Sequence, residues 1–135
     1  MERIIVYIDW CRSNFSGSFS ENVPGGVAFA ADTYEEAQRE AQATLDFHLQ
    51  GYAEGGEAPQ WYLDKDYELV FQPTAAALLH SYSADISLAA ISRATGINQT
   101  QLSHYANGLK TPRPAQRQRI VDGIHAIGRR LLAVE

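Results

Sequence analysis

Residues 87–108 carry the sequence SLAAISRATGINQTQLSHYANG, which is typical of two short helices joined by a sharp turn. Ser87 is a good N-cap for the first helix, because its hydroxyl oxygen can accept from a free amide of the first turn. Gly96 follows the last turn of that helix, where a left-handed residue lets the chain change direction sharply. The side of this helix that we expect to be apolar carries Leu88, Ile91 and Thr95.

The second helix begins after Asn98, a preferred N-cap, and Gln101 stands three residues later at capping-box spacing. Ile97 is expected to fill the corner, and Leu102 and Tyr105 are expected to face inward. Helical spacing places polar residues together on the opposite face. They are Gln99, Thr100, Ser103, His104 and Asn107.

This polar face predicts DNA recognition. Ser92 is small enough to let the two helices approach closely, which leaves the second helix free to enter a major groove. Uncharged polar side chains can form hydrogen bonds with base edges there, and basic side chains in the next loop can hold phosphates. The expected base-reading residues are Gln99, Thr100, Ser103 and His104. The expected backbone contacts are Asn98, Asn107, Lys110, Thr111 and Arg113. An ordinary helical hairpin would explain Gly96 but neither the polar face nor the basic loop.

A last helix is expected after Pro112 and Pro114. Its apolar residues are Ile120, Val121, Ile124, Ile127 and Leu131. Leu131 and Leu132 leave apolar surface that could join two subunits, and we expect a homodimer or higher oligomer with recognition helices about 34 Å apart. Gly123 and Gly128 either weaken this helix or allow close packing.

The first half predicts a small α+β layer, with strands over 3–10, 14–20, 26–30 and 67–72. The continuous apolar run from Ile4 to Ile8 predicts a central strand that is buried on both faces. Thr33 and Glu36 have capping-box spacing for a helix before the last strand. Its inner face carries Tyr34, Ala37, Ala41, Leu45, His48 and Tyr52. We therefore expect a β-β-β-α-β domain at 1–72 and an all-α domain at 73–135.

Charge is distributed unevenly along the chain. Residues 1–84 hold four Lys or Arg against thirteen Asp or Glu, a net charge of −9, and residues 85–135 hold seven against three, a net charge of +4. A basic half suits phosphate, and an acidic half suits a basic protein. Cys11 has no second cysteine for a disulfide or a zinc site, and no segment is typical of a signal peptide or a membrane span. We expect a cytoplasmic protein without metal or cofactor.

Residues 92–108 resemble the helix-turn-helix of the Cro-type repressor family. That pattern runs from a small residue through glycine to an inward aliphatic residue, a Tyr or Trp, and an Asn-Gly pair. The matching residues are Ser92, Gly96, Ile97, Leu102, Tyr105 and Asn107-Gly108. Two positions depart from it, since Thr95 stands where an apolar residue is usual and Ala106 where Glu is common.

Residues 21–37, ENVPGGVAFAADTYEEA, resemble the signature of HicB-type antitoxins. The resemblance implies a truncated ribonuclease H-like fold in the first domain, followed by the DNA-binding module. It further implies that the protein binds and blocks HicA, a small basic toxin that cleaves mRNA, and represses its own operon. The acidic residues that we select by charge as toxin contacts are Glu21, Asp32, Glu35, Glu36, Asp64 and Asp66.

Catalysis and stand-alone repression are the two other functions that this sequence brings into question. Ribonuclease H folds can be catalytic, but that chemistry needs several carboxylates around two metal ions, and Asp9 has no clear partners. His48, His80 and His125 have no partners at metal-ligand spacing, and His48 is expected to be a packing residue. We therefore expect no catalysis. The alternative is a stand-alone repressor whose first domain senses a ligand or only oligomerises.

Overall fold

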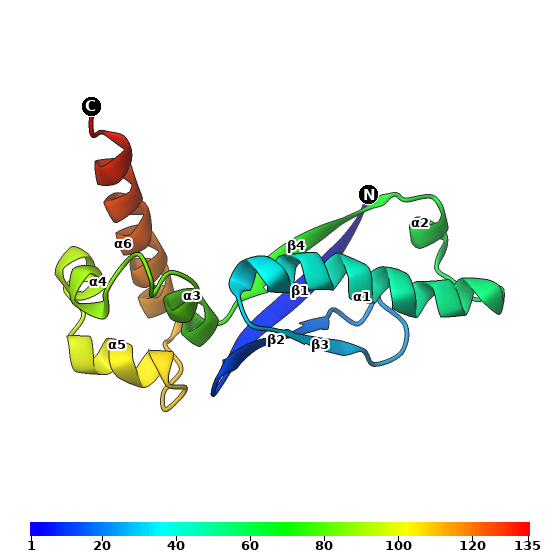
Figure 1. The fold of residues 1–135 in the computed structure, drawn as a ribbon, viewed down its shortest axis with the longest axis horizontal. Helices are drawn as coiled ribbons and strands as arrows, with labels where there is room; N and C mark the ends of the chain where they lie inside the picture. The colour runs from blue at the N-terminus through cyan, green and yellow to red at the C-terminus, as the bar shows by residue number, and fades with distance from the viewer. The chain divides into compact units, whose positions relative to one another are not determined.

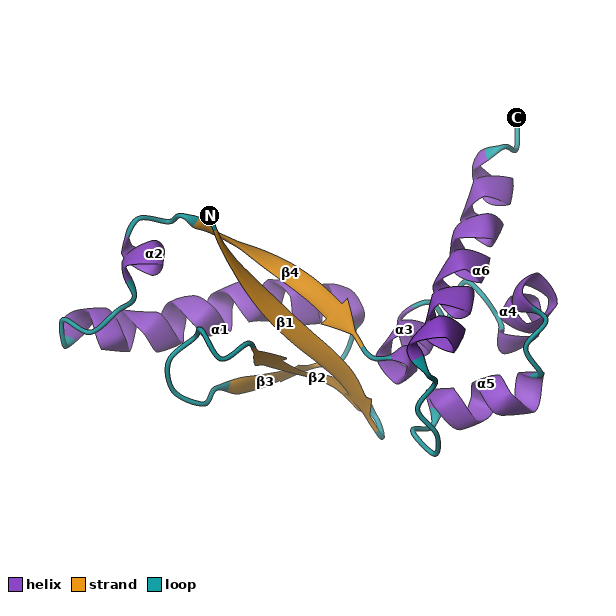
Figure 2. Cartoon of the chain, turned by 180° about the vertical axis from the view of Figure 1, so that it is seen from behind, coloured by secondary structure: helices purple, strands orange, loops and turns teal.

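The computed structural model describes residues 1–135 and divides into two compact units, Met1–Thr74 and Ala75–Glu135. The class is mixed α+β, as predicted, with a four-stranded sheet and helices (Figure 1). All four strands lie in the first unit, and the second unit contains only helices (Figure 2). The division falls two residues after the boundary expected from the sequence, because the last strand continues to Pro73.

The first unit contains β1 (Glu2–Cys11), β2 (Asn14–Phe19), β3 (Ala28–Ala31), α1 (Tyr34–Glu54), α2 (Gln60–Leu63) and β4 (Tyr67–Pro73). The strand order in the sheet is β3-β2-β1-β4. β1 pairs with β4 in parallel, and the other pairs are antiparallel. α1 lies across one face of the sheet (Figure 1). The short helix α2 has no counterpart among the elements expected from the sequence.

The burial of β1 corrects one expectation. The strand is central, since it lies between β2 and β4. However, Ile4, Val6 and Ile8 are fully buried, whereas Ile5 is only half-buried and Tyr7 is 42% exposed. The prediction that both faces are buried was wrong, because α1 covers one face only and alternate side chains of a strand point to opposite faces.

The cap predicted for α1 is present. The Thr33 hydroxyl accepts from the Glu36 amide at 3.1 Å, and the Glu36 carboxylate accepts from the Asp32 amide at 3.0 Å. The buried side of the helix carries Ala37, Ala41, Leu45 and Leu49. His48 is a packing residue, as expected, whose Nε2 lies 2.7 Å from the Pro24 carbonyl oxygen. These contacts hold α1 over the sheet.

Three aromatic side chains pack beside α1 where α2 leads into β4. They are Trp61, Tyr62 and Tyr67. The Tyr62 hydroxyl donates to Asp46 Oδ1 at 2.9 Å, and Gln42 Nε2 donates to the Tyr67 hydroxyl at 2.9 Å. Burial, the hydrogen bond to Asp46 and the negative charge of Asp46 together raise the pKa of Tyr62 to about 12. A neutral Tyr62 therefore stabilises this corner of the unit.

The raised pKa predicts a loss of stability at alkaline pH. The unfolded chain releases the Tyr62 proton near its ordinary pKa of about 10, whereas the folded chain keeps it until about 12. The contribution of Tyr62 is complete below pH ~10 and is lost as the pH rises toward ~12. Ultraviolet titration of the phenolate band should show this late tyrosine, and Asp46→Asn should lower its pKa. An unchanged titration in Asp46→Asn would contradict the assignment.

The second unit contains α3 (Ala75–Ser81), α4 (Leu88–Thr95), α5 (Gln99–Ala106) and α6 (Pro114–Leu132). Its core is made of Leu79, Ile91, Ile97, Leu102, Tyr105, Ala106, Ile120 and Ile127. All four helices contribute residues to this core, and Ile97 joins them from the turn between α4 and α5. His80 Nε2 lies 2.9 Å from the Ala106 carbonyl oxygen, which links α3 to the end of α5.

The two glycines of α6 differ in what surrounds them. Gly123 is buried, and a Cβ built on it would overlap the Cγ2 methyl group of Thr95 on α4. Gly128 has nothing within 4 Å of a built Cβ. Gly123 therefore allows α4 and α6 to pack closely, and Gly128 has no such packing reason.

This difference predicts opposite effects of two alanine substitutions. Gly128→Ala should stabilise the protein by about 0.5–1 kcal/mol, because alanine favours a helix over glycine. Gly123→Ala should destabilise it by about 1–3 kcal/mol through overpacking against Thr95. Urea unfolding measures both. Thr95→Ser removes the methyl group and should recover much of the loss in Gly123→Ala; equal effects of the two alanines would contradict the packing.

Candidate nucleic-acid interface

The turn between α4 and α5 is fixed by a dense set of hydrogen bonds. Gly96 has a φ of 76° and a ψ of 4°, the left-handed conformation that its position predicted. The Ser92 hydroxyl donates to the Ile97 carbonyl at 2.6 Å. The Thr95 hydroxyl donates to the Ile91 carbonyl at 2.7 Å and accepts from the Ile97 amide at 3.1 Å. Ser92 therefore contributes more than its small size, because its hydroxyl supplies a hydrogen-bond donor to the Ile97 carbonyl in the turn.

α6 supports the same turn from outside. Arg119 Nη2 donates to the Thr95 carbonyl at 2.7 Å, at the end of α4 where carbonyl groups lack helical partners. This role of Arg119 could not be predicted from the sequence, because nothing in the spacing of α6 distinguishes Arg119 from its neighbouring arginines. The turn therefore has partners on both α4 and α6.

The N-caps of both helices are observed. Ser87 Oγ accepts from the Ala90 amide at 3.0 Å, and Asn98 Oδ1 accepts from the Thr100 amide at 2.8 Å. Gln101 does not complete a capping box, and that expectation was wrong. Its Nε2 donates instead to the hydroxyl of buried Tyr105 at 2.9 Å, which satisfies a polar group in the core.

The polar face of α5 lies on the outside of the unit. Gln99, Thr100 and Asn107 are exposed, and Ser103 is half-buried. Leu102 and Tyr105, on the inner side, are buried as expected. The face therefore offers amide and hydroxyl groups, all without charge, along the length of a two-turn helix.

His104 differs from the other residues of this face. It is half-buried, and its Nδ1 atom is enclosed without a hydrogen-bond partner. Its Nε2 is the only ring nitrogen left as a candidate for contact with a base. The backbone carbonyl of His104 also accepts from the amides of Leu109 and Lys110, at 2.9 and 3.3 Å, and thereby holds the loop after α5.

The basic loop lies between α5 and α6. Lys110, Thr111 and Arg113 are exposed, and they line a hollow together with Gln101, Tyr105, Ala115 and Gln116. Neither Lys110 nor Arg113 takes part in an ion pair. α6 has no acidic residue in its first turn. The loop thus combines two free cations with the positive end of a helix dipole.

The six acidic residues selected by charge do not form one surface. Asp32, Glu35 and Glu36 lie at the beginning of α1, next to the end of β3. Asp66 lies beside the start of β1, where its backbone carbonyl accepts from the Glu2 amide at 3.0 Å. The strand register aligns Ala31, at the end of β3, with Phe15 of β2, which in turn pairs with Trp10 of β1. Trp10 is eight strand residues from Glu2, a distance of about 26 Å. Glu21 precedes Asn22, whose side chain donates to Glu2, and Asp64 lies two residues before Asp66, so both are near the Glu2 end of β1 and away from Asp32.

The structure gives no support to a metal site. No group of three or more His, Cys, Asp or Glu residues could hold an ion. Asp9 accepts from the Thr74 hydroxyl and from the Trp10 amide, both at 2.8 Å, at the end of the sheet.

Comparison with known proteins adds no family. The chain matches no family model, no curated protein and no solved structure. None of its helices has the length and apolar character needed to cross a membrane.

Proposed function

We propose that the second unit is a helix-turn-helix module that binds a DNA duplex with α5 in the major groove. The observation that carries the proposal is the exposed, uncharged polar face of α5, followed directly by the free cations Lys110 and Arg113. The net charge of +4 on residues 85–135 favours approach to phosphates. A merely structural hairpin would need neither feature.

Base reading is assigned to the start of α5. The exposed Gln99 can form two hydrogen bonds with adenine, and the methyl group of Thr100 can contact that of thymine. Ser103 and His104 lie farther along the same face as supplementary contacts. Asn98, Asn107, Lys110, Thr111 and Arg113 are assigned to the sugar-phosphate backbone, which fixes register but carries no sequence information.

A second copy of the chain completes the proposed DNA reader. Leu131 and Leu132, at the end of α6, are 65% and 86% exposed and follow the last buried residue of that helix, Ile127. Pairing through this end would bury the leucines. A dimer would then present two α5 helices to half-sites about 34 Å apart.

For the whole chain we propose an antitoxin of the HicB type, with a partial ribonuclease H-like domain at 1–72. It would bind and neutralise a HicA-type mRNA-cleaving toxin and repress its own operon. The charge of the first unit supports this proposal, since it holds four basic and thirteen acidic residues, a net charge of −9. Such a charge favours contact with a toxin whose own RNA-binding surface is basic. The chain would thus act by binding and not by catalysis.

The DNA assignment predicts different losses for a base-reading and a phosphate-binding residue. Gln99→Ala should cost about 1–3 kcal/mol on the preferred site and little on random DNA. Arg113→Ala should weaken binding to both and reduce by about 1 the slope of log K against log salt. Fluorescence anisotropy across a salt series measures both. Equal losses on both DNAs for Gln99→Ala, or an unchanged slope for Arg113→Ala, would contradict the assignment.

The antitoxin assignment predicts rescue from toxicity. A small basic open reading frame should lie beside this gene, and its expression alone should arrest growth and degrade mRNA. Co-expression of this chain should restore growth, even with the DNA-binding variant Arg113→Ala, because neutralisation is assigned to the first unit. Failure of the wild-type chain to rescue growth would leave a stand-alone repressor as the better account.

A further inference from the structure

β3 is an edge strand of the sheet and carries neither of the residue types that most often shield such an edge. A terminal strand presents unpaired amide and carbonyl groups, and proteins commonly shield such edges with Lys or Pro. β3 has the sequence AFAA and contains neither residue. The opposite edge strand, β4, ends in Pro73, and its Glu68 lies 3.7 Å from Arg3 in an ion pair. The two edges of the sheet are therefore protected unequally.

The side chains of β3 leave its outer edge accessible. Phe29 pairs with Gly17, and its ring lies across the space that a Cβ of Gly17 would occupy. Ala31 is buried, whereas Ala28 and Ala30, which alternate with them along the strand, are exposed. Only methyl groups border the exposed side of β3, so another extended chain can approach its backbone closely.

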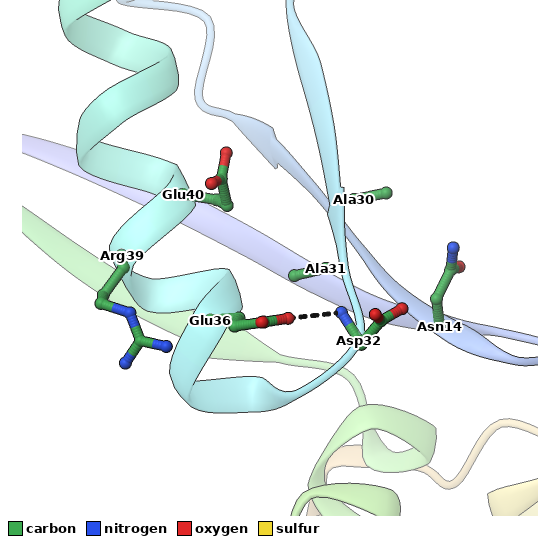
Figure 3. Close-up of a pocket in the computed structure, with 7 residues that line it drawn as sticks. All are labelled: Asn14, Ala30, Ala31, Asp32, Glu36, Arg39 and Glu40. Atoms are coloured by element: carbon green, nitrogen blue, oxygen red, sulfur yellow. Dashed lines mark hydrogen bonds between the residues drawn. The ribbon is translucent and has the colours of Figure 1, made fainter.

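An acidic groove runs between this edge and α1. We call it the edge groove, and its lining residues are Asn14, Ala30, Ala31, Asp32, Glu36, Arg39 and Glu40 (Figure 3). Asp32 and Glu40 are exposed and form no ion pair. One oxygen of Glu36 is held by the Asp32 amide. The groove thus carries three carboxylates against a single guanidinium.

Arg39 does not neutralise these carboxylates. Its guanidinium points away from β3 (Figure 3), and it forms no ion pair with Glu36 or Glu40. Asp32 and Glu36 are among the acidic residues expected from charge alone, whereas Glu40 is not, because only the fold brings the second turn of α1 beside β3. The groove is left with an excess of negative charge next to unpaired backbone groups.

We propose that an extended, Lys- or Arg-bearing segment of a protein partner binds along β3 as a fifth strand, with its cations in the edge groove. Strand addition supplies affinity through main-chain hydrogen bonds, and side chains that alternate along the added strand supply specificity. A second copy of this chain is a poor occupant, since its own β3 would bring the same carboxylates into apposition. The proposal rests on the antitoxin function only for the partner's identity.

A synthetic peptide tests the edge directly. The probe is an eight-residue peptide that alternates Lys with Val or Thr, and its control has Glu in place of Lys. Added to the ¹⁵N-labelled full chain, the cationic peptide should slow amide exchange within Ala28–Ala31 and leave β4 unchanged. Absence of binding at millimolar peptide, binding without protection of β3, or equal binding of the acidic control would each overturn the proposal.

Charge reversal tests the groove. Asp32→Lys/Glu40→Lys should weaken peptide binding about tenfold, as the loss of two exposed charge pairs predicts. Glu54→Lys/Glu57→Lys is the matched control, because it makes the same change in net charge at two exposed positions, the last residue of α1 and a residue of the loop that follows it. Asp32→Asn/Glu40→Gln should give a smaller loss and guards against misfolding, which urea unfolding monitors. Equal losses in the Asp32/Glu40 reversal and the Glu54/Glu57 control would overturn the groove assignment.

Rescue experiments separate this proposal from the antitoxin function. If the wild-type chain fails to rescue growth but the cationic peptide protects β3, the antitoxin function is wrong and the edge site stands. If the wild-type chain rescues growth and Asp32→Lys/Glu40→Lys rescues it equally well, the antitoxin function stands and the edge site is wrong. Rescue that is lost in the Asp32/Glu40 variant but kept in the Glu54/Glu57 control supports both.

Discussion

The left-handed turn at Gly96 determines the direction of α5, and the proposed DNA-binding surface depends on it. With a φ of 76°, Gly96 adopts a conformation that strains other residues. Hydroxyl groups of Ser92 and Thr95 then satisfy both backbone groups of Ile97, and Arg119 reaches from α6 to the Thr95 carbonyl. Ile97 in turn is buried in the core of the unit. Because these contacts fix the inner side of α5, its outer side can present polar groups in a fixed orientation.

In the first unit, too, the packing of one side of an element determines which surface is accessible to a partner. Within the first unit, α1 covers one face of a four-stranded sheet, and no other element of that unit covers the opposite face or pairs with the outer edge of β3. The capping contacts between Asp32, Thr33 and Glu36 start α1 directly beside that edge. A device that stabilises a helix N-terminus therefore also concentrates negative charge next to unpaired backbone groups. The unequal charges of the two units, −9 and +4 by residue count, suit partners of opposite charge.

The features that local chemistry controls could be predicted from the sequence. The caps at Thr33, Ser87 and Asn98, the left-handed Gly96 and the inward Leu102 and Tyr105 depend on neighbours a few residues away. Features that depend on distant residues could not. The apolar run from Ile4 to Ile8 does not indicate that a helix covers only one face of the sheet. The hydrogen bond from Gln101 to the buried Tyr105 and the contact of Gly123 with Thr95 both depend on how the helices pack, which the local sequence does not determine. Likewise, a list of acidic residues does not show which of them share a surface.

The central claim is that α5 is the element that reads DNA. Its most direct test is a titration of the ¹⁵N-labelled full chain with a duplex taken from the region upstream of its own gene, followed by chemical-shift mapping. The account predicts that the largest shifts fall on Gln99, Thr100 and Ser103 and on the loop from Lys110 to Arg113, and that a scrambled duplex leaves the α5 shifts small. Shifts that spare α5, or that are the same with both duplexes, would contradict it.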